Sequence, residues 1–317
     1  MPLSREQVVW AYRILLDRDP EGEEVIAPKM RTYETTQALR HDLVTSLEYQ
    51  EKNPDIALAD ERTLVMCEIE DGLRLWLDLA DRAIGLNIAR GRYELNEVDF
   101  LRRVVRPGAS VIDCGAHVGY FAMHLGRLVG PEGTVAAFEP LDGNADCLER
   151  SVKENAFDGR VQVKRAAVGA RTGVADLVLA SGAVHSGGAF LRRPGEGLPS
   201  AHAARPVRTV ALDDCPLRRP VSVIKADIEG AEPLAFRGAA RLLREDRPII
   251  LSELHPYQLE RVSGDTAAAF IAEMASAGYA CHLLGAGTAG AQIDDAPSNG
   301  VTSVVFLPSG AAVRETR

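Results

Sequence analysis

The segment that most constrains the fold of this chain is an apolar run that ends in an acidic residue and two glycines. Residues 111–121 read VIDCGAHVGYF, and residues 136–140, one strand and one helix later, read AAFEP. The first run predicts a buried strand that turns into a helix at its glycines, and the second predicts a parallel strand beside it. Parallel sheets bind their ligands at the carboxyl ends of such strands.

Strand and helix patterns alternate from residue 110 onward, which is typical of an α/β fold. We expect helices near 119–129, 143–155, 231–243 and 265–277, and strands at 110–115, 134–139, 161–168, 221–228, 248–254, 279–284 and 301–307. Residues 285–300 read as a loop, which allows the last two strands to pair antiparallel. Residues 180–206 are rich in Gly, Pro, His and Ala and are predicted to form a functional loop. The expected architecture is a seven-stranded, mostly parallel, Rossmann-like sheet with helices on both faces.

Three segments are predicted along the chain: a small helical module at 1–53, a connecting hairpin and helix at 54–108, and a ligand-binding domain at 109–317. The hairpin follows from Asp71-Gly72 between two apolar runs, and the helix from the pattern at 94–105. Residues 12–22 and 46–49 resemble a small helical domain of unknown function that accompanies bacterial enzymes acting on sugars. The alternative is a helical cap that belongs to the main domain.

Composition limits the setting and the partners. The 317 residues carry a formal net charge of −9, which disfavours a nucleic-acid partner. The five cysteines are widely spaced and form no C-x-x-C motif, so neither a disulfide framework nor a zinc site is indicated. The start lacks the apolar core of a signal peptide, and no apolar stretch approaches a membrane span. We therefore expect a cytoplasmic protein with a small-molecule or glycan partner; a homo-oligomer stays open.

The first strand–helix turn indicates the ligand. Asp113 stands where a dinucleotide-binding loop would have an apolar residue or glycine, and an acid suits an amino group, which S-adenosylmethionine has and NAD lacks. Gly115 allows a tight turn, and Gly119 opens a helix whose free N–H groups suit a carboxylate. Glu139 can accept both ribose hydroxyls, with a helix-capping role as the alternative. Ala167 belongs to a group of small residues that would leave room for adenine.

A second group of polar residues ends the two strands predicted next. Lys225 and Asp227 share one face of a strand, and Glu253 and His255 share a face of its neighbour. Because isolated charges are costly in a buried sheet, a role in the site is indicated, with a structural ion pair as the alternative. His255 or Asp227 would act as the base, with Lys225 fixing Asp227. Asp227, Glu253 and His255 also have ligand types for a divalent metal, which is not favoured because no spacing demands it.

Several blocks together resemble the FkbM family of S-adenosylmethionine-dependent methyltransferases, which act mostly on hydroxyls of sugars and natural products. These blocks are residues 111–121, 138–140, 209–214, 224–232 and 253–255, and the similarity runs from about residue 73 to 284. The resemblance implies a class I methyltransferase sheet with Asp227 near the transferred methyl group. One departure is His117, where the family usually has Asn. We expect substrate choice near residues 185–188.

The residues assigned from these arguments fall into three groups. The catalytic candidates are Asp227, His255 and Lys225. The substrate candidates are His185, Ser186, Glu229 and Glu253. The cofactor candidates are Asp113, Gly115, Ala116, His117, Gly119, Tyr120, Phe121, Glu139, Pro140, Ala167 and Asp227.

The predicted function is methyl transfer from S-adenosylmethionine to a hydroxyl of a sugar, glycoside or related natural product. One alternative is a nicotinamide-dependent oxidoreductase, but that class expects G-x-G-x-x-G, which residues 113–119 do not provide. A second alternative is a non-catalytic scaffold, against which the joint presence of Asp113, Glu139 and Asp227 speaks. A nucleic-acid base methyltransferase is disfavoured because the strand at 221–228 ends in Asp-Ile-Glu-Gly. Such enzymes have an N/D-P-P-aromatic motif there, which holds the amino group of a flipped base.

Overall fold

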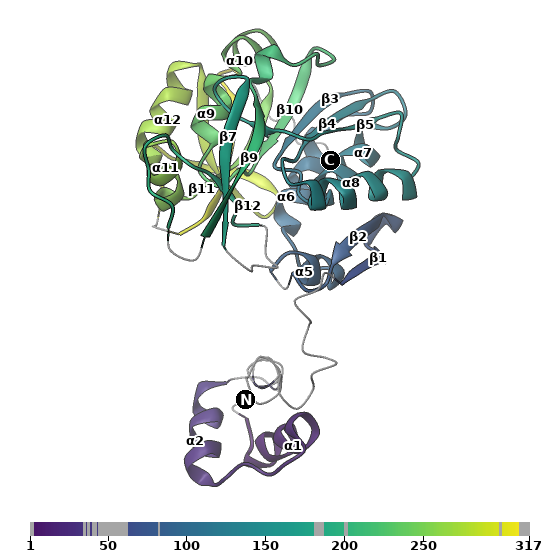
Figure 1. The fold of residues 1–317 in the computed structure, drawn as a ribbon, viewed down its shortest axis with the longest axis vertical. Helices are drawn as coiled ribbons and strands as arrows, with labels where there is room; N and C mark the ends of the chain where they lie inside the picture. Colours follow the sequence, from purple (N-terminus) through teal and green to yellow (C-terminus); the bar gives the residue numbers. More distant parts are fainter. Residues whose placement is uncertain are drawn as a thin grey trace. The chain divides into compact units, whose positions relative to one another are not determined.

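The computed structural model in Figure 1 describes residues 3–33, 36, 39, 43, 63–81, 83–180, 187–199, 202–297 and 300–310. The chain divides into two compact units, residues 1–63 and residues 64–317. Among the described residues, none of the helices combines the length and the apolar character that crossing a membrane requires.

Two helices of the first unit, α1 (Arg5–Leu16) and α2 (Glu23–Thr32), follow the helical pattern of the sequence. Ser4 caps α1: its hydroxyl accepts from the Gln7 backbone N–H at 3.2 Å, and its own N–H donates to the Gln7 side chain at 2.8 Å. Val8, Tyr12 and Leu16 repeat at helical spacing and are buried against Ile26 of α2. Apolar packing thus holds this small unit together.

The second unit begins with the predicted hairpin. Strands β1 (Leu64–Glu68) and β2 (Arg74–Asp78) pair antiparallel around a short turn, η1 (Glu70–Gly72). Asp71 at the turn has a left-handed backbone with φ 62°, as the Asp-Gly signal predicts. Two helices follow, α5 (Gly85–Ala89), which the sequence reading missed, and α6 (Leu95–Val104), which was predicted.

The main sheet has eight strands in the order β13-β12-β14-β11-β10-β3-β4-β5. The strands from β11 to β5 in this order run parallel, and β14 pairs antiparallel with both β11 and β12. The antiparallel pairing of the last two predicted strands is confirmed. The strands are β3 (Ser110–Cys114), β4 (Thr134–Phe138), β5 (Val161–Lys164), β10 (Val221–Ala226), β11 (Ile249–Leu254), β12 (Tyr279–Gly285), β13 (Thr288–Gln292) and β14 (Thr302–Pro308).

The prediction of seven strands was wrong by one edge strand. β13 reads TAGAQ, a sequence without large apolar side chains, and most of it is exposed. It pairs with β12 at the edge of the sheet. Its extended conformation therefore depends on backbone pairing with β12 and not on the β-propensity of its own residues. The single strand predicted at 161–168 was also wrong. It divides into β5 and β6 (Ala167–Val168), and β6 belongs to another sheet.

That second, four-stranded sheet has the order β6-β9-β7-β8. Strand β7 (Gly173–Ala180) pairs antiparallel with the long β9 (His202–Val210), and β8 (Phe190–Leu191) pairs with β7. The loop predicted at 180–206 was therefore wrong for the residues of β8 and β9. The exposed, mostly polar or alanine side chains of residues 202–206 gave no strand signal, because their backbone pairing with β7 is a tertiary effect.

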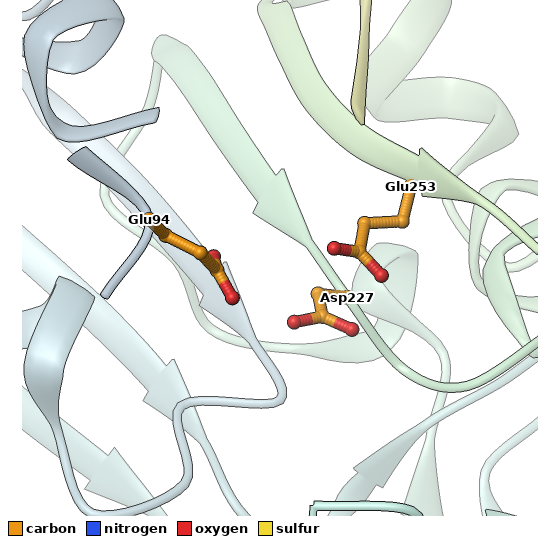
Figure 2. Close-up of side chains that lie close together, drawn as sticks. All are labelled: Glu94, Asp227 and Glu253. Atoms are coloured by element: carbon orange, nitrogen blue, oxygen red, sulfur yellow. The ribbon is translucent and has the colours of Figure 1, made fainter. Parts of the chain in front are cut away.

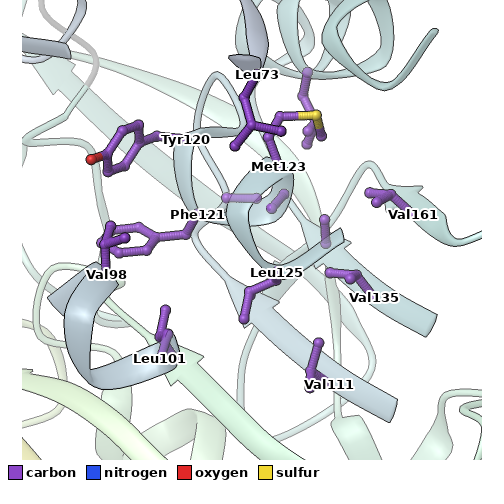
Figure 3. Packing of buried hydrophobic residues seen from close by; sticks show 14 of the residues in the cluster. Leu73, Val98, Leu101, Val111, Tyr120, Phe121, Met123, Leu125, Val135 and Val161 are labelled. Carbon is purple, nitrogen blue, oxygen red and sulfur yellow. The ribbon is translucent and has the colours of Figure 1, made fainter. Parts of the chain in front are cut away.

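Helices cover both faces of the main sheet, as predicted. Alternate residues of each strand enter different cores: Val111, Val135 and Val223 pack with α6, α7 (Tyr120–Val129) and α8 (Asp142–Glu154) (Figure 3). Ile112, Ala136 and Ile224 pack on the other face with α9 (Glu232–Arg237), α10 (Ala240–Asp246) and α12 (Ala267–Ser276). Such two-sided burial explains the continuous apolar strands in the sequence.

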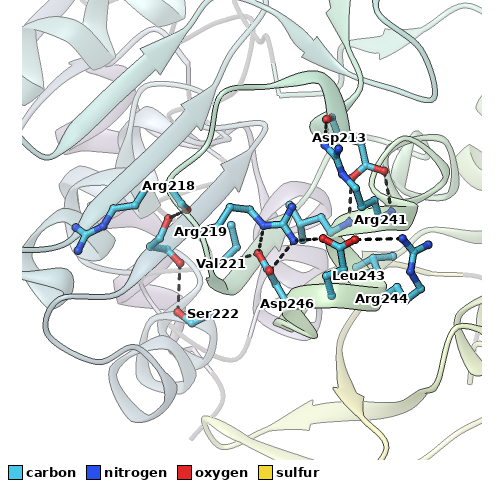
Figure 4. Close-up of polar contacts among 12 residues, drawn as sticks. Asp213, Arg218, Arg219, Val221, Ser222, Arg241, Leu243, Arg244 and Asp246 are labelled. Carbon is cyan, nitrogen blue, oxygen red and sulfur yellow. Dashed lines mark hydrogen bonds and ion pairs between the residues drawn. The ribbon is translucent and has the colours of Figure 1, made fainter.

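The helix predicted at 231–243 was wrong as a single element, because α9 ends near Gly238 and α10 starts separately. Asp213 caps α10 by accepting from the backbone N–H groups of Arg241 at 2.7 Å and Leu242 at 2.9 Å. At the other end, Asp246 accepts from the Val221 backbone at 2.8 Å and pairs with Arg219 (Figure 4). Helix α11 (Pro256–Val262) was not predicted.

Candidate functional site

A cavity lies at the carboxyl ends of β3, β4 and β10, the place where parallel sheets bind ligands. It is lined by many of the residues predicted from the sequence, namely Gly115, Ala116, His117, Tyr120, Phe121, Glu139, Pro140, Ala167, Lys225, Asp227 and Glu229.

Two glycines shape the turn between β3 and α7. Gly115 has φ +79°, and a Cβ at this position would lie 2.1 Å from the carbonyl oxygen of Asp227. Gly115 is thus required by the close approach of β3 to the end of β10, and not only by a ligand. Gly119 precedes α7 with φ +100°, and a Cβ there would lie 2.5 Å from a methyl group of Leu148. Gly119 does not line the cavity but sets the start of the helix against α8.

The side chain of Glu139 is held by backbone donors from two turns. Its Oε2 accepts from the N–H of His117 at 2.9 Å, and its Oε1 accepts from the N–H of Leu141 at 2.9 Å and from Asn144 at 3.4 Å. Burial raises the pKa of Glu139 to about 7, and these hydrogen bonds oppose that rise. The carboxylate is therefore fixed at the cavity wall, with room on Oε2 for one more donor.

Asp113 is fully buried on β3, and neither of its carboxylate oxygens has a hydrogen-bond partner within the described part of the chain. Asp113 is in register with Lys225 on the neighbouring β10, so the two side chains share one face of the sheet. Burial raises the pKa of Asp113 to about 6, although Lys225 opposes the rise. An unpartnered buried carboxylate is costly, and a ligand or a water molecule that donated hydrogen bonds would satisfy it.

Lys225 and Asp227 form a nearly buried ion pair, with Nζ 3.2 Å from Oδ2. The ammonium also lies 4.6 Å from the centre of the Phe121 ring, a cation–π arrangement. Burial alone would lower the pKa of Lys225, but the carboxylates of Asp227 and Asp113 raise it above its usual value. Lys225 therefore stays charged, and both members of the pair line the cavity.

Two further carboxylates, each from a different element, lie close to Asp227 of this ion pair (Figure 2). Glu94, Asp227 and Glu253 each place an oxygen within 4.8 Å of the others. Burial is the main cause that raises the pKa of Glu94 to about 7 and the pKa of Glu253 well above its usual value. Carboxylate oxygens are ligands for hard cations and acceptors for hydroxyl protons. We call these three residues the carboxylate cluster.

The structure does not bring all predicted residues to the cavity. Asp113, Gly119, Glu253 and His255 are absent from its described lining. Glu253 is nevertheless part of the carboxylate cluster. The possible metal ligands named from the sequence were Asp227, Glu253 and His255, whereas the structure groups Glu94 with Asp227 and Glu253. His255 lies before α11 with its ring 6.4 Å from that of Tyr257. The predicted substrate residues His185 and Ser186 lie outside the described residues.

Sequence reasoning missed two groups of residues at the site. Ile84, Ile88 and Tyr93 reach the cavity from the segment that was predicted only to lead into the core. Leu177 of β7 and Leu191 of β8 reach it from the second sheet and Ala189 from just before β8, a region whose strands β7 and β8 were not predicted. Glu94 was also missed, and the only signal was an acidic residue just before a helix, which is common for reasons of capping.

Comparison with known proteins gives a family and several partial relatives. The family model described as "Methyltransferase FkbM domain" matches residues 113–281, more than half of the chain. A ribosomal RNA large subunit methyltransferase E from Delftia acidovorans is 38% identical over 61 residues, and one from Verminephrobacter eiseniae is 35% identical over 86 residues. These stretches are 19% and 23% of this chain, and the chain spans only 27% and 35% of these curated relatives.

Among solved structures, a methyltransferase FkbM from Methylobacillus flagellatus KT is similar with 16% identity and a TM-score of 0.38. The match covers 94% of this chain and 58% of that one. The family model includes the end of β3, Glu139, and Lys225 to Glu253, which contribute much of the cavity and of the carboxylate cluster. From this match, the chain belongs to the FkbM methyltransferase domain family.

Proposed function

We propose that this protein transfers the methyl group of S-adenosylmethionine to a hydroxyl of a sugar, glycoside or related natural product. The observation that carries the proposal is the pair of carboxylates at the ends of β3 and β4. Asp113 is fully buried without a partner, and Glu139 is fixed at the cavity wall by backbone donors. The two groups suit the opposite ends of one ligand, an amino group and a ribose.

The residues present fit S-adenosylmethionine. Asp113 is absent from the described lining, so it would accept from the ammonium group through a bridging water, and the first turn of α7 offers N–H groups for the carboxylate. Oε2 of Glu139 would accept from a ribose hydroxyl. Ala167, Leu177 and Leu191 provide an apolar wall for the adenine ring.

S-adenosylmethionine, when bound, supplies an electrophilic methyl group on a positively charged sulfur. The chain must then place an acceptor oxygen in line and take its proton. Asp227 is the best-placed base because it lines the cavity and belongs to the carboxylate cluster. Lys225 holds Asp227 through the 3.2 Å ion pair. A positioned base contributes roughly 10²- to 10⁴-fold to the rate. His255 is the second candidate for the base, although it is not among the described residues that line the cavity.

Charge at the site supports a neutral acceptor. Glu139, Asp227 and Glu229 line the cavity, and Lys225 is the cation among its described lining residues. A phosphate-rich acceptor would meet uncompensated negative charge there. The curated relatives are ribosomal RNA methyltransferases, which makes ribosomal RNA the competing acceptor. We propose that no nucleic acid is the substrate.

The test is transfer of label from S-adenosylmethionine carrying a radioactive methyl group. Candidate acceptors are a panel of monosaccharides, nucleotide sugars and glycosides, with purified ribosomal RNA in a separate arm. Label is expected in a sugar-containing product and absent from an Asp227→Asn control. Label in RNA alone would overturn the acceptor class. A well-folded protein that binds NADH and not S-adenosylhomocysteine would overturn the proposal itself.

A further inference from the structure

The hydroxyl of Tyr120 links three segments that are distant in the sequence. It lies 2.9 Å from the backbone carbonyl oxygen of Tyr93 and 2.9 Å from Oε1 of Glu70. Tyr120 is the first residue of α7 and is nearly fully buried, and its ring packs edge-on against Tyr93 with centroids 5.3 Å apart. His124, one turn along α7, places Nε2 3.4 Å from Oε1 of Glu70. The hydroxyl has one proton, which it donates to one of these two acceptors at a time, and its position places the start of α7 against both the hairpin turn and the segment before α6.

The residue that follows this anchored carbonyl is Glu94 of the carboxylate cluster. Its backbone is left-handed, with φ 42° and ψ 49°, and its side chain makes no cap contact with α6. A glutamate adopts this conformation only where the surrounding structure holds it. The contacts of Tyr120 with Tyr93 act on the adjacent peptide, so they are well placed to hold Glu94 beside Asp227 and Glu253.

We propose that Tyr120 is a positioning residue whose hydroxyl, through the backbone of Tyr93, holds the Glu94 carboxylate beside Asp227. This inference rests on the proposed function, because the carboxyl group of Glu94 lies beside Asp227, which lines the cavity and is the proposed base. The role is distinct from cofactor contact by the tyrosine ring, which phenylalanine would retain. Glu70 is the second acceptor for the same hydroxyl proton, so the bond to the Tyr93 carbonyl is shared with it.

The test measures how well the protein distinguishes S-adenosylmethionine from S-adenosylhomocysteine. The two ligands share most of their contacts, but the sulfur is positively charged only in the first, so the ratio of their dissociation constants reports nearby negative charge. Tyr120→Phe and Glu94→Gln are each expected to reduce the preference for S-adenosylmethionine by about threefold or more. Loosening of the structure alone would weaken both ligands together and leave the ratio unchanged.

A double-mutant cycle shows whether Tyr120 acts through Glu94. If it does, Tyr120→Phe has no further effect on the ratio in a Glu94→Gln background, whereas independent roles give additive effects. Tyr279→Phe is the matched control, because its buried hydroxyl also bonds a backbone carbonyl, that of Leu243 at 3.3 Å, far from the cavity lining. This control is expected to keep the wild-type ratio.

The outcomes separate the inference from the proposed function. Wild-type protein that binds neither ligand overturns both. Wild-type protein that binds both ligands, together with additive effects in the cycle, overturns only the positioning role. If Glu94→Gln leaves the ratio of the two dissociation constants unchanged, the positioning role is also overturned, whatever the result for Tyr120→Phe. With an active acceptor, Tyr120→Phe is further expected to lower kcat, and to raise the KM for S-adenosylmethionine by about the same factor as the dissociation constant of that ligand.

Discussion

Glu139→Gln is the substitution that best separates ligand binding from folding at this site. Glu139 uses both carboxylate oxygens as acceptors, towards the backbone of His117 and of Leu141. A glutamine offers one oxygen and one NH₂ group, so one of these backbone N–H groups loses its acceptor. The same change removes the charge that a ribose hydroxyl would meet at Oε2.

The expected loss of affinity follows from one hydrogen bond to a charged acceptor. Such a bond contributes about 2 kcal/mol, which corresponds to roughly 30-fold in the dissociation constant. Stability should change less than affinity, because the unsatisfied N–H costs energy while removal of a buried charge is favourable. The pKa of Glu139, raised to about 7, shows that its charged form is already disfavoured in the protein without ligand.

Calorimetric titration with S-adenosylhomocysteine measures this loss, and thermal unfolding checks that the variant is folded. Glu232→Gln is the matched control. Glu232 is also buried and accepts a backbone N–H, that of Ile228 at 2.8 Å, but it is not part of the described cavity lining. We expect the control to bind within about threefold of wild type, well inside the effect of one lost bond. A folded Glu139→Gln variant that bound equally well would refute the ribose assignment.

Three further predictions concern the base, the pH dependence and metal ions. Asp227→Asn is expected to lower kcat by about 100-fold or more, with a smaller loss for His255→Ala; full turnover in both variants would remove the proposed base. Burial raises the pKa values of Glu139 and Glu229 to about 7, so the native protein without ligand binds more protons than the unfolded chain between pH 4.5 and 7. Its free energy of unfolding should therefore fall as pH rises through this window, as denaturant titrations at pH 5.5 and 7.5 would show; a rise would contradict the burial argument. Chelation with EDTA is expected to leave turnover unchanged because Lys225 already balances Asp227, and activity lost in EDTA but restored by Mg²⁺ would instead assign a cation to the carboxylate cluster.

The main sheet could be predicted because its central strands are buried on both faces. Runs such as residues 110–114 and 221–226 are apolar enough to be predicted as buried strands from their own residues alone. The elements that were missed depend on their partners. β13 is a strand because β12 lies beside it, and the residues of β9 near 202–206 are exposed and mostly polar or alanine. No local pattern distinguishes such residues from a loop.

At the candidate site too, some residues could be predicted from local sequence and others depend on the folded structure. Glu139 and Lys225 could be predicted to share the site because their places at strand ends put them at one edge of the sheet. Glu94 could not, because it precedes a helix in a segment with no strand-end motif, and only folding brings it to Asp227. Gly115 was expected to allow a tight turn, and the structure adds a second reason, because a Cβ there would lie 2.1 Å from the carbonyl oxygen of Asp227.

A crystal structure of the protein with S-adenosylhomocysteine would show whether Asp113 and Glu139 lie at the two ends of one bound ligand. We predict a ribose hydroxyl within hydrogen-bonding distance of Oε2 of Glu139, the amino group on the side of Asp113, and the sulfur facing Asp227. A ligand bound outside the cavity, or one whose ribose and amino group contact neither carboxylate, would contradict the account.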